Sequence, residues 1–287
     1  MQATESRRTA IGRRFRPQGL IVYLLLIGIT LISAIPLYWL IRSSLMTNAE
    51  IFIFPPRFVP NTFRWDNYVK AYRSFPALMY LGNTLSIVVP CVIGVTLTSA
   101  MCGYALARID FPGRKIWFTL VIGSMILPGH VVLIPQYITF AKAGMINTYW
   151  PFWLAAWMGG GASNIFLMRQ FMRTLPKEYD EAAIIDGANR FQIFVKILLP
   201  LIVPVLITVS IFSFMGYWND FQGPLIYLQR DSRFTLALGL LSFRGAYSSK
   251  WNYLMAASTA MIMPAIILFA VGQKYFLRGI TLTGLKG

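Results

Sequence analysis

Long apolar segments alternate with short charged ones along this chain. Six stretches contain no Asp, Glu, Lys or Arg and are long enough to cross a membrane once, since about 20 apolar residues span the ~30 Å hydrocarbon core of a bilayer. The pattern therefore predicts an all-α membrane protein with six membrane-spanning helices, at about residues 19–41, 82–107, 116–140, 148–168, 199–219 and 253–274.

The composition agrees with a bilayer environment. The chain is 56% hydrophobic and 13% charged, whereas a soluble domain is about 25% charged. The net charge of +16 does not indicate nucleic-acid binding, because the basic residues form short clusters between apolar runs. Such clusters suit anionic lipid headgroups and control of topology. We therefore expect membrane lipid, and no nucleic acid, as a partner.

The distribution of basic residues predicts the orientation. Six crossings place both ends of the chain on one side of the membrane. The loops and tails on that side carry 16 of the 26 Lys and Arg residues, and basic loops tend to stay in the cytoplasm. We predict a basic cytoplasmic tail over residues 1–18, a six-helix domain over 19–278 with a cytoplasmic loop at 169–198, and a cytoplasmic tail over 279–287.

The sequence offers little for catalysis. His130 is the only histidine; we expect it to pack or form hydrogen bonds, with proton relay as the alternative. Cys91 and Cys102 lie about three helical turns apart in one apolar run, too far to form a disulfide with each other. No G-x-x-x-x-G-K-[ST] phosphate-binding loop occurs. We therefore expect no catalytic residue, bound cofactor or metal, and any ATP hydrolysis must come from other subunits.

The polar loop between the fourth and fifth predicted crossings contains "TLPKEYDEAAIIDG". This stretch predicts a helix with Pro176 at its first position, where the missing N–H costs nothing. Glu178, Asp180 and Glu181 fall in its first turns, where the helix dipole favours them. Gly187 follows at a position typical of a left-handed helix cap, and "NRFQIFVKILLP" begins a second helix that leads into the next crossing.

This charged helix is better suited to a protein partner than to a lipid surface. Ala182 and Ala183 are small, so another backbone can approach the helix closely. An amphipathic helix resting on headgroups is the alternative, but anionic lipid repels an acidic first turn. We therefore favour docking to a protein.

The same loop resembles a family signature. The order Glu181-Ala182-Ala183, three residues, Gly187, nine residues, Ile197, one residue, Leu199-Pro200 is similar to the cytoplasmic loop of ABC importer permeases. In that family the loop is a coupling helix that docks on the ATP-hydrolysing subunit. The resemblance implies these docking residues: Glu178, Glu181, Ala182, Ala183, Asp186 and Gly187.

Other segments resemble the carbohydrate-uptake branch, and within it the maltose-type permease that pairs with a second, different permease. They are "GYALARIDFPGRK" (103–115), "LPGHVVLIPQY…GMINTYWPF" (127–152), "YWNDFQGPLIYL" (217–228) and "GITLTGLKG" (279–287). Two places depart from the pattern: the run Gly159-Gly160-Gly161, and Gln222-Gly223, where large apolar residues are common.

The resemblance implies a transport role with several partners. This chain would import a di- or oligosaccharide by alternating access in the cytoplasmic (inner) membrane of a bacterium or archaeon. It would act with a second homologous permease, with two ATP-binding cassette subunits that hold ATP and Mg, and with an extracellular or periplasmic solute-binding protein. The identity of the sugar and of the partner permease, and which permease contacts the sugar, stay open.

Sugar sites combine aromatic faces with amide and hydroxyl groups. The candidates for the substrate pathway are Gln136, Tyr137, Trp218, Asn219 and Gln222. For Trp218 and its neighbour Tyr217, an interfacial belt position is an equally good interpretation.

Two alternative functions remain. A permease for glycerol phosphate or a glycerophosphodiester predicts Arg or Lys inside the pathway, and the predicted crossings contain none before Lys274, the last residue of the sixth. An ATP-independent secondary transporter predicts ionisable residues within the membrane and inverted repeats, and His130 is the only such residue.

Overall fold

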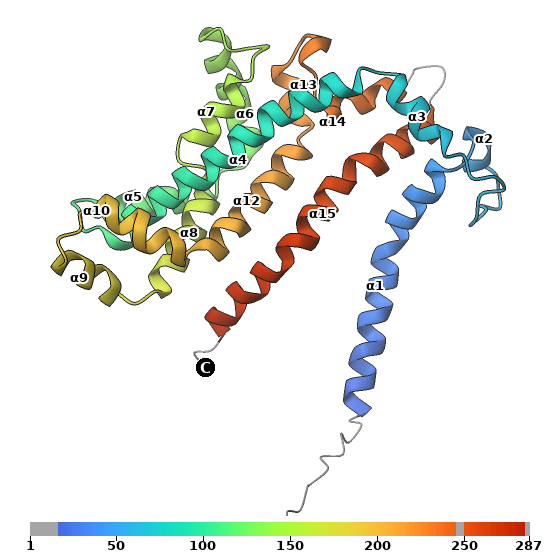
Figure 1. The fold of residues 1–287 in the computed structure, drawn as a ribbon. Helices are drawn as coiled ribbons and strands as arrows, with labels where there is room; N and C mark the ends of the chain where they lie inside the picture. Colours follow the sequence, from blue (N-terminus) through green and yellow to red (C-terminus); the bar gives the residue numbers. More distant parts are fainter. Residues whose placement is uncertain (1–16, 245–249, 285–287) are drawn as a thin grey trace, which may run out of the picture.

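The computed structural model describes residues 17–244 and 250–284, and the regular elements within them are helices (Figure 1). Three are long: α1 (Pro17–Ser44), α4 (Ala77–Arg108) and α15 (Trp251–Gly284). Helix α4 lies at the centre, packed against α7 (Trp150–Trp157), α8 (Ala162–Thr174) and α12 (Val203–Trp218), and α12 also contacts α15. The main core therefore lies between α4, α8 and α12.

Helix α1 differs from the others because it stands away from the core (Figure 1). None of its most apolar 18-residue window is buried, and apolar side chains cover it on every side. It packs against α15, and its last residues, Arg42 to Ser44, are buried. A helix that is apolar all round and exposed is suited to lipid or to another membrane helix.

Two of the predicted crossings are bent. The third consists of α5 (Arg114–Ser124) and α6 (Gly129–Lys142), which meet at 102° next to Pro128. The fifth is bent by 79° at Ile202, between the residues that end at Leu201 and α12. Proline lacks the N–H that continues a helical ladder, and Pro128, Pro200 and Pro204 lie at these breaks.

The fourth predicted crossing, 148–168, is two short helices rather than one. Helix α7 ends at Trp157 and α8 begins at Ala162, because Gly159, Gly160 and Gly161 all have positive φ between them. By length and composition, three described helices can cross a membrane, or five if each bent pair counts as one. The structure therefore supports an all-helical membrane fold, and six crossings remain a prediction.

The segment that leads into α12 contains a π-helix. The short α10 (Arg190–Gln192) begins with a capping box between Asn189 and Gln192. It continues into η1 (Ile193–Leu198), a π-helix, and then into α11 (Leu199–Leu201). π-Turns are rare and often mark functional positions.

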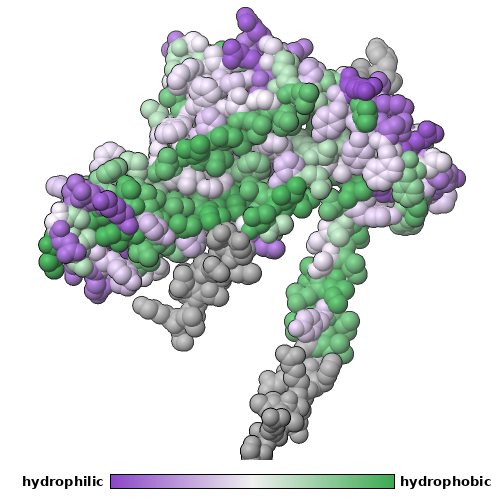
Figure 2. All heavy atoms as spheres, in the orientation of Figure 1, coloured by the Kyte–Doolittle hydropathy of each residue, from purple (hydrophilic) through white to green (hydrophobic). Residues whose placement is uncertain are grey.

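The short helices divide between the two ends of the molecule. Helix α9 (Glu178–Ile185) lies at the lower left of Figure 1. The opposite end holds α2 (Asn48–Ile51), α3 (Asp66–Arg73), α13 (Gln222–Tyr227), η2 (Asp231–Arg233), α14 (Leu236–Gly239) and η3 (Leu240–Phe243). Figure 2 shows hydrophobic surface over the long helices and hydrophilic surface toward both ends. This distribution is the one that a membrane crossing requires.

The predicted tails fall partly outside the described residues. Residues 1–16 and 285–287 are outside the described ranges. The C-terminal tail predicted from residue 279 is helical as far as Gly284, because α15 continues through it.

Candidate functional site

The predicted charged helix is present as α9, with small differences at its start. It begins at Glu178 and leaves Pro176 outside, two residues before the first helical position. It ends as predicted: Gly187 has φ +79°, and the N–H of Ala188 donates to the carbonyl of Ala183 at 2.9 Å. This bond belongs to a Schellman motif, which needs a residue that adopts the left-handed conformation readily.

The C-terminal end of α4, the predicted second crossing, holds the link between α8 and α9. Arg108, the last residue of α4, donates from Nη2 to the carbonyls of Met172 (2.6 Å) and Leu175 (2.7 Å). Its Nη1 lies 3.2 Å from the Asp180 carboxylate, and the Arg108 side chain is 3% exposed. One buried guanidinium therefore holds the end of α8, the link and the first turn of α9 together.

A second side chain, one turn earlier on α4, holds the other arm of the loop. The hydroxyl of Tyr104 donates to the carbonyl of Arg190 at 3.0 Å, and its ring stacks on Phe194 with 5.1 Å between centroids. Both arms of the α9 loop are thus attached to the same end of α4. This role was not predicted from the sequence, although two polar side chains four residues apart at the end of an apolar helix indicate a contact there.

Four of the six expected docking residues surround one hollow of about 590 Å³ on one side of α9: Ala182, Ala183, Asp186 and Gly187. Ala183 is buried in the main core, and the other three are exposed. Glu178 is exposed and lines neither hollow beside α9, while Glu181 faces a second hollow on the other side of the helix. We call the first one the docking hollow.

Three apolar residues of α9 were not singled out in the sequence. Tyr179, Ile184 and Ile185 are exposed, and Ile185 is 86% exposed. Tyr179 lines the docking hollow and Ile184 the hollow on the other side, so apolar groups are exposed on more than one face of α9. Exposed apolar groups on a polar helix suit contact with another protein.

A separate, open hollow of about 340 Å³ lies between α4, α7, α8 and α12. We call it the polar hollow, and its lining includes these polar residues: Asn164, Ser213, Tyr217 and Asp220. The hydroxyl of Ser213 is buried without a hydrogen-bond partner in the described structure. The Asp220 carboxylate accepts the N–H of Gly223 at 3.0 Å. Amide, hydroxyl and carboxylate groups here can bind a hydroxyl-rich ligand.

The glycine run explains how this hollow forms. Gly160 has φ +70°, and a Cβ built on it would lie 2.5 Å from the carbonyl oxygen of Val95. Only glycine therefore lets the α7–α8 break press against α4. Asn164 donates to the Gly160 carbonyl at 2.8 Å, which satisfies a backbone group freed by the break.

The five residues expected along the substrate pathway lie outside the polar hollow. Trp218 is buried, stacks on Phe214, and donates from its indole to the carbonyl of Met261 at 2.9 Å. Asn219 is exposed and donates to the carbonyl of Met215 at 2.9 Å. These contacts give Trp218 a role in packing.

The other three candidates lie on α6 and α13. Gln222 approaches His130, with 3.5 Å between its Nε2 and the ring Nδ1. Tyr137 stacks on Tyr227, and Gln136 is exposed. Among residues 17–244 and 250–284, no three His, Cys, Asp or Glu side chains form a possible metal site.

Sequence reasoning could have found part of the polar hollow. Ser213 and Tyr217 are four residues apart, which places them on one face of α12, and Asp220 follows two residues after that helix ends. Asn164 carried no such signal, because its proximity to α12 depends on the break between α7 and α8.

Comparison with known proteins agrees with this architecture. The family described as "Binding-protein-dependent transport system inner membrane component" matches residues 95–282. The arabinooligosaccharides transport system permease protein AraQ of Halalkalibacterium halodurans is 36% identical over 92% of this chain and 96% of its own length. A probable ABC transporter permease protein of Bacillus subtilis, YurM, is 33% identical over 88% of this chain and 84% of its own length.

A solved structure has the same fold. It is a crystal structure of a bacterial ABC transporter involved in the import of the acidic polysaccharide alginate, with a TM-score of 0.79 and 23% identity over 92% of this chain and 98% of that chain. At this identity the likeness concerns the fold. Together with the family match over residues 95–282, these relatives show that the chain belongs to the binding-protein-dependent inner-membrane transport components, the permease subunits of ABC transporters.

Proposed function

We propose that this chain is the permease subunit of an ATP-driven importer for a neutral di- or oligosaccharide. It works with a second homologous permease, two ATP-binding cassette subunits that hold ATP and Mg, and an external solute-binding protein. The observation that carries the proposal is α9, a charged helix with exposed apolar residues beside the docking hollow. The segments before and after α9 are both attached to α4. A helix presented in this way suits docking to an ATPase.

The polar hollow supports a neutral sugar. Its described lining offers amide, hydroxyl, phenol and carboxylate groups and no cationic side chain. A phosphate-bearing substrate would need Arg or Lys there, and Asp220 would repel it. Relatives named for arabinooligosaccharides and for diacetylchitobiose are in accord with this choice.

The proposed mechanism is alternating access. Closure of the ATPase subunits moves α9, and α4 follows because Arg108 and Tyr104 hold the loop. Helix α12 also follows, since η1 and α11 connect it to the loop. Because α4 and α12 both line the polar hollow, their displacement changes access to it.

We also propose six crossings with both termini in the cytoplasm of a bacterial or archaeal cell, counting α7 and α8 as one interrupted crossing. The described start of α1, helix α9 and the end of α15 lie toward the lower part of Figure 1, opposite α2 and α3. This common side supports the orientation predicted from charge.

The test is co-purification with an ATP-binding cassette subunit encoded alongside the permease, in mild detergent, for wild type, Glu181→Arg and Gly187→Trp. We expect wild type to retain the ATPase and both variants to lose it while staying monodisperse. If both variants still co-purify with the ATPase subunit, Glu181 and Gly187 do not belong to the docking surface. A wild-type chain that transports solute without any ATPase would overturn the proposed function.

A further inference from the structure

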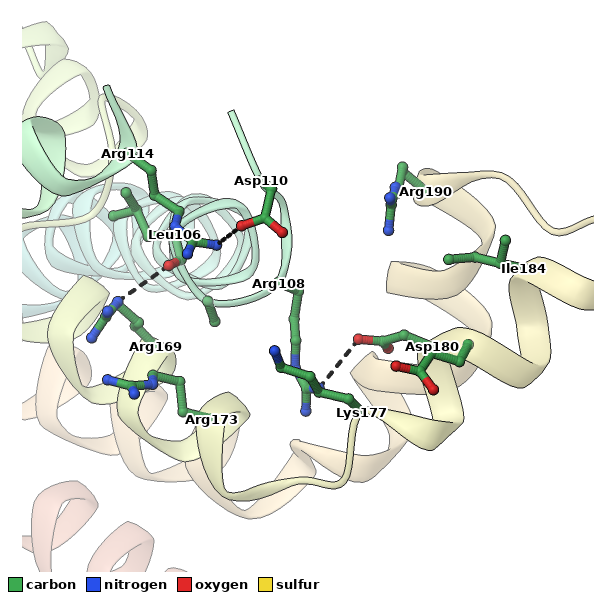
Figure 3. A pocket seen from close by; sticks show the side chains of 12 residues that line it. Leu106, Arg108, Asp110, Arg114, Arg169, Arg173, Lys177, Asp180, Ile184 and Arg190 are labelled. Carbon is green, nitrogen blue, oxygen red and sulfur yellow. Dashed lines mark hydrogen bonds and ion pairs between the residues drawn. The ribbon is translucent and has the colours of Figure 1, made fainter. Parts of the chain in front are cut away.

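The second hollow beside α9 is strongly basic. It measures about 410 Å³ and lies between the end of α4, the start of α5, α8, α9 and α10 (Figure 3). Three carboxylates line it, and six cationic residues do so: Arg108, Arg114, Arg169, Arg173, Lys177 and Arg190. The lining therefore carries a formal excess of three positive charges, and we call it the basic hollow.

Half of these cations are held by the protein itself. Arg108 pairs with Asp180 at 3.2 Å, and Arg114 pairs with Asp110 at 2.6 Å. Arg169 donates to the Leu106 carbonyl at 3.2 Å and lies over an aromatic ring of α5. These three form a fixed wall.

The other three cations have no ion-pair partner in the described part of the chain. Arg173 projects from α8, Lys177 from the start of α9, and Arg190 from α10. Figure 3 shows Arg169 and Arg173 on one side of the hollow and Arg190 on the other. In addition, Nε of Arg108 and Oδ1 of Asp180 are buried without a hydrogen-bond partner in the described structure. The hollow therefore presents cationic side chains from several elements that no carboxylate of the described residues pairs with.

We propose that the basic hollow binds the phosphate group of an anionic phospholipid. Guanidinium groups match phosphate oxygens in bidentate geometry, and basic pockets between helices on the cytoplasmic side suit lipid headgroups. The adjoining helix favours a lipid over a soluble phosphate. Helix α5 begins at the hollow with Arg114 and then exposes Ile116, Trp117 and Leu120, which suit acyl chains and the membrane interface.

This assignment rests on the proposed orientation, because it places the α9 end at the cytoplasmic leaflet. Its consequence concerns coupling. Arg173 of α8 and Arg190 of α10 precede and follow α9 in the chain, and both line the hollow, so a headgroup bound there would attract both arms of the loop. An anionic lipid would thus stiffen the base on which α9 moves.

The test is lipid binding by the full chain with its co-purified partners, measured by native mass spectrometry during titration with phosphatidylglycerol or phosphatidylcholine. The variant is Arg173→Gln/Arg190→Gln. The matched control is Arg57→Gln/Lys142→Gln, which removes two exposed charges outside the basic hollow. We expect the variant to weaken phosphatidylglycerol binding roughly thirtyfold, about fivefold per residue, and the control to leave it unchanged. Phosphatidylcholine should bind weakly to all forms.

Each other outcome contradicts part of the proposal. Equal losses in variant and control would mean diffuse attraction without a site, and no loss in either would remove the site. Competition by millimolar inorganic phosphate, lost in the variant, would assign the hollow to a soluble phosphate. Arg173→Lys/Arg190→Lys keeps the charge and should retain most of the binding, which separates charge from misfolding. The assay requires neither sugar nor ATP turnover, so its failure is distinguishable from failure of the transport proposal.

Discussion

The α9 loop and the polar hollow are built in opposite ways. The loop is one continuous segment whose proposed docking residues follow each other in sequence, and all of them except the buried Ala183 are exposed. The polar hollow contains residues from α4, α7, α8, α12 and the link between α12 and α13. Two of them, Val95 and Asp220, are more than 120 positions apart in the sequence. The loop depends on side-chain contacts at its base, whereas the hollow depends on a backbone break. Substitutions should therefore affect the two sites by different routes.

The largest effect is expected at the base of the loop. Arg108→Ala removes the donor to two carbonyls and leaves the Asp180 carboxylate buried and unpaired. Breaking a buried pair from one side costs about 3–5 kcal/mol. We expect a large fall in thermal stability in detergent and loss of transport-coupled ATPase activity.

A matched control is Arg114→Ala. Its partner Asp110 is 91% exposed, and exposed pairs contribute about 0–1 kcal/mol. Similar melting losses in the two variants would show that Arg108 is not a special attachment of the loop.

The second-largest effect is expected from a substitution beside the polar hollow. Gly160→Ala places a Cβ against the Val95 carbonyl and forces a left-handed conformation on alanine. The conformational cost is about 1–2 kcal/mol, and the overpacking costs about 1–3 kcal/mol more. We expect lower stability and reduced sugar uptake, with α9 still able to bind the ATPase.

Gly144→Ala separates the two costs. Gly144 also has a positive φ, but nothing lies within 4 Å of its added Cβ. It should show only the conformational cost. A loss in Gly144→Ala as large as that in Gly160→Ala would mean that contact with α4 contributes nothing.

A smaller effect is expected at the apolar tip of α9. Ile185→Ser should weaken ATPase binding about ten- to a hundredfold without changing the melting temperature, because burying one such side chain at an interface is worth about 1.5–3 kcal/mol. Leu78→Ser alters a similarly exposed side chain, 85% exposed, at the start of α4. Binding data that do not distinguish the two variants would place Ile185 outside the interface.

The smallest effect compares the two proposed locations of the sugar. Ser213→Ala removes a buried, unpartnered hydroxyl of the polar hollow and should raise the KM for uptake about three- to tenfold, the size of one hydrogen bond. Asn219→Ala, outside the hollow, should change KM less. The reverse order would return the substrate pathway to the residues chosen from sequence.

The sequence predicted what depends on contiguous residues. The apolar runs indicated the long helices, and the spacing of Gly187 after the acidic turn indicated where α9 ends. The breaks at Pro128 and at Gly159 to Gly161 changed the predicted third and fourth crossings, because a helix needs an uninterrupted hydrogen-bond ladder as well as apolar residues.

Contacts between distant segments were the part that could not be predicted. Arg108 and Asp180, which form a buried ion pair, are 72 positions apart in the sequence. Asn164 meets α12 only because Gly160 lets the chain approach α4. Side-chain type alone did not indicate these neighbours, nor did it indicate that Trp218 and Asn219 donate to the carbonyls of Met261 and Met215.

The π-helix η1 makes the connection from α9 to α12 adjustable. A π-helical turn holds one residue more than an α-helical turn. Moving this extra residue by one position along the chain changes which residues face α4 without unfolding the segment. The 79° bend at Ile202 follows within one turn. Displacement of α9, as proposed, would therefore rotate α12 about its own axis as well as translate it. The rotation would change which side chains of α12 line the polar hollow.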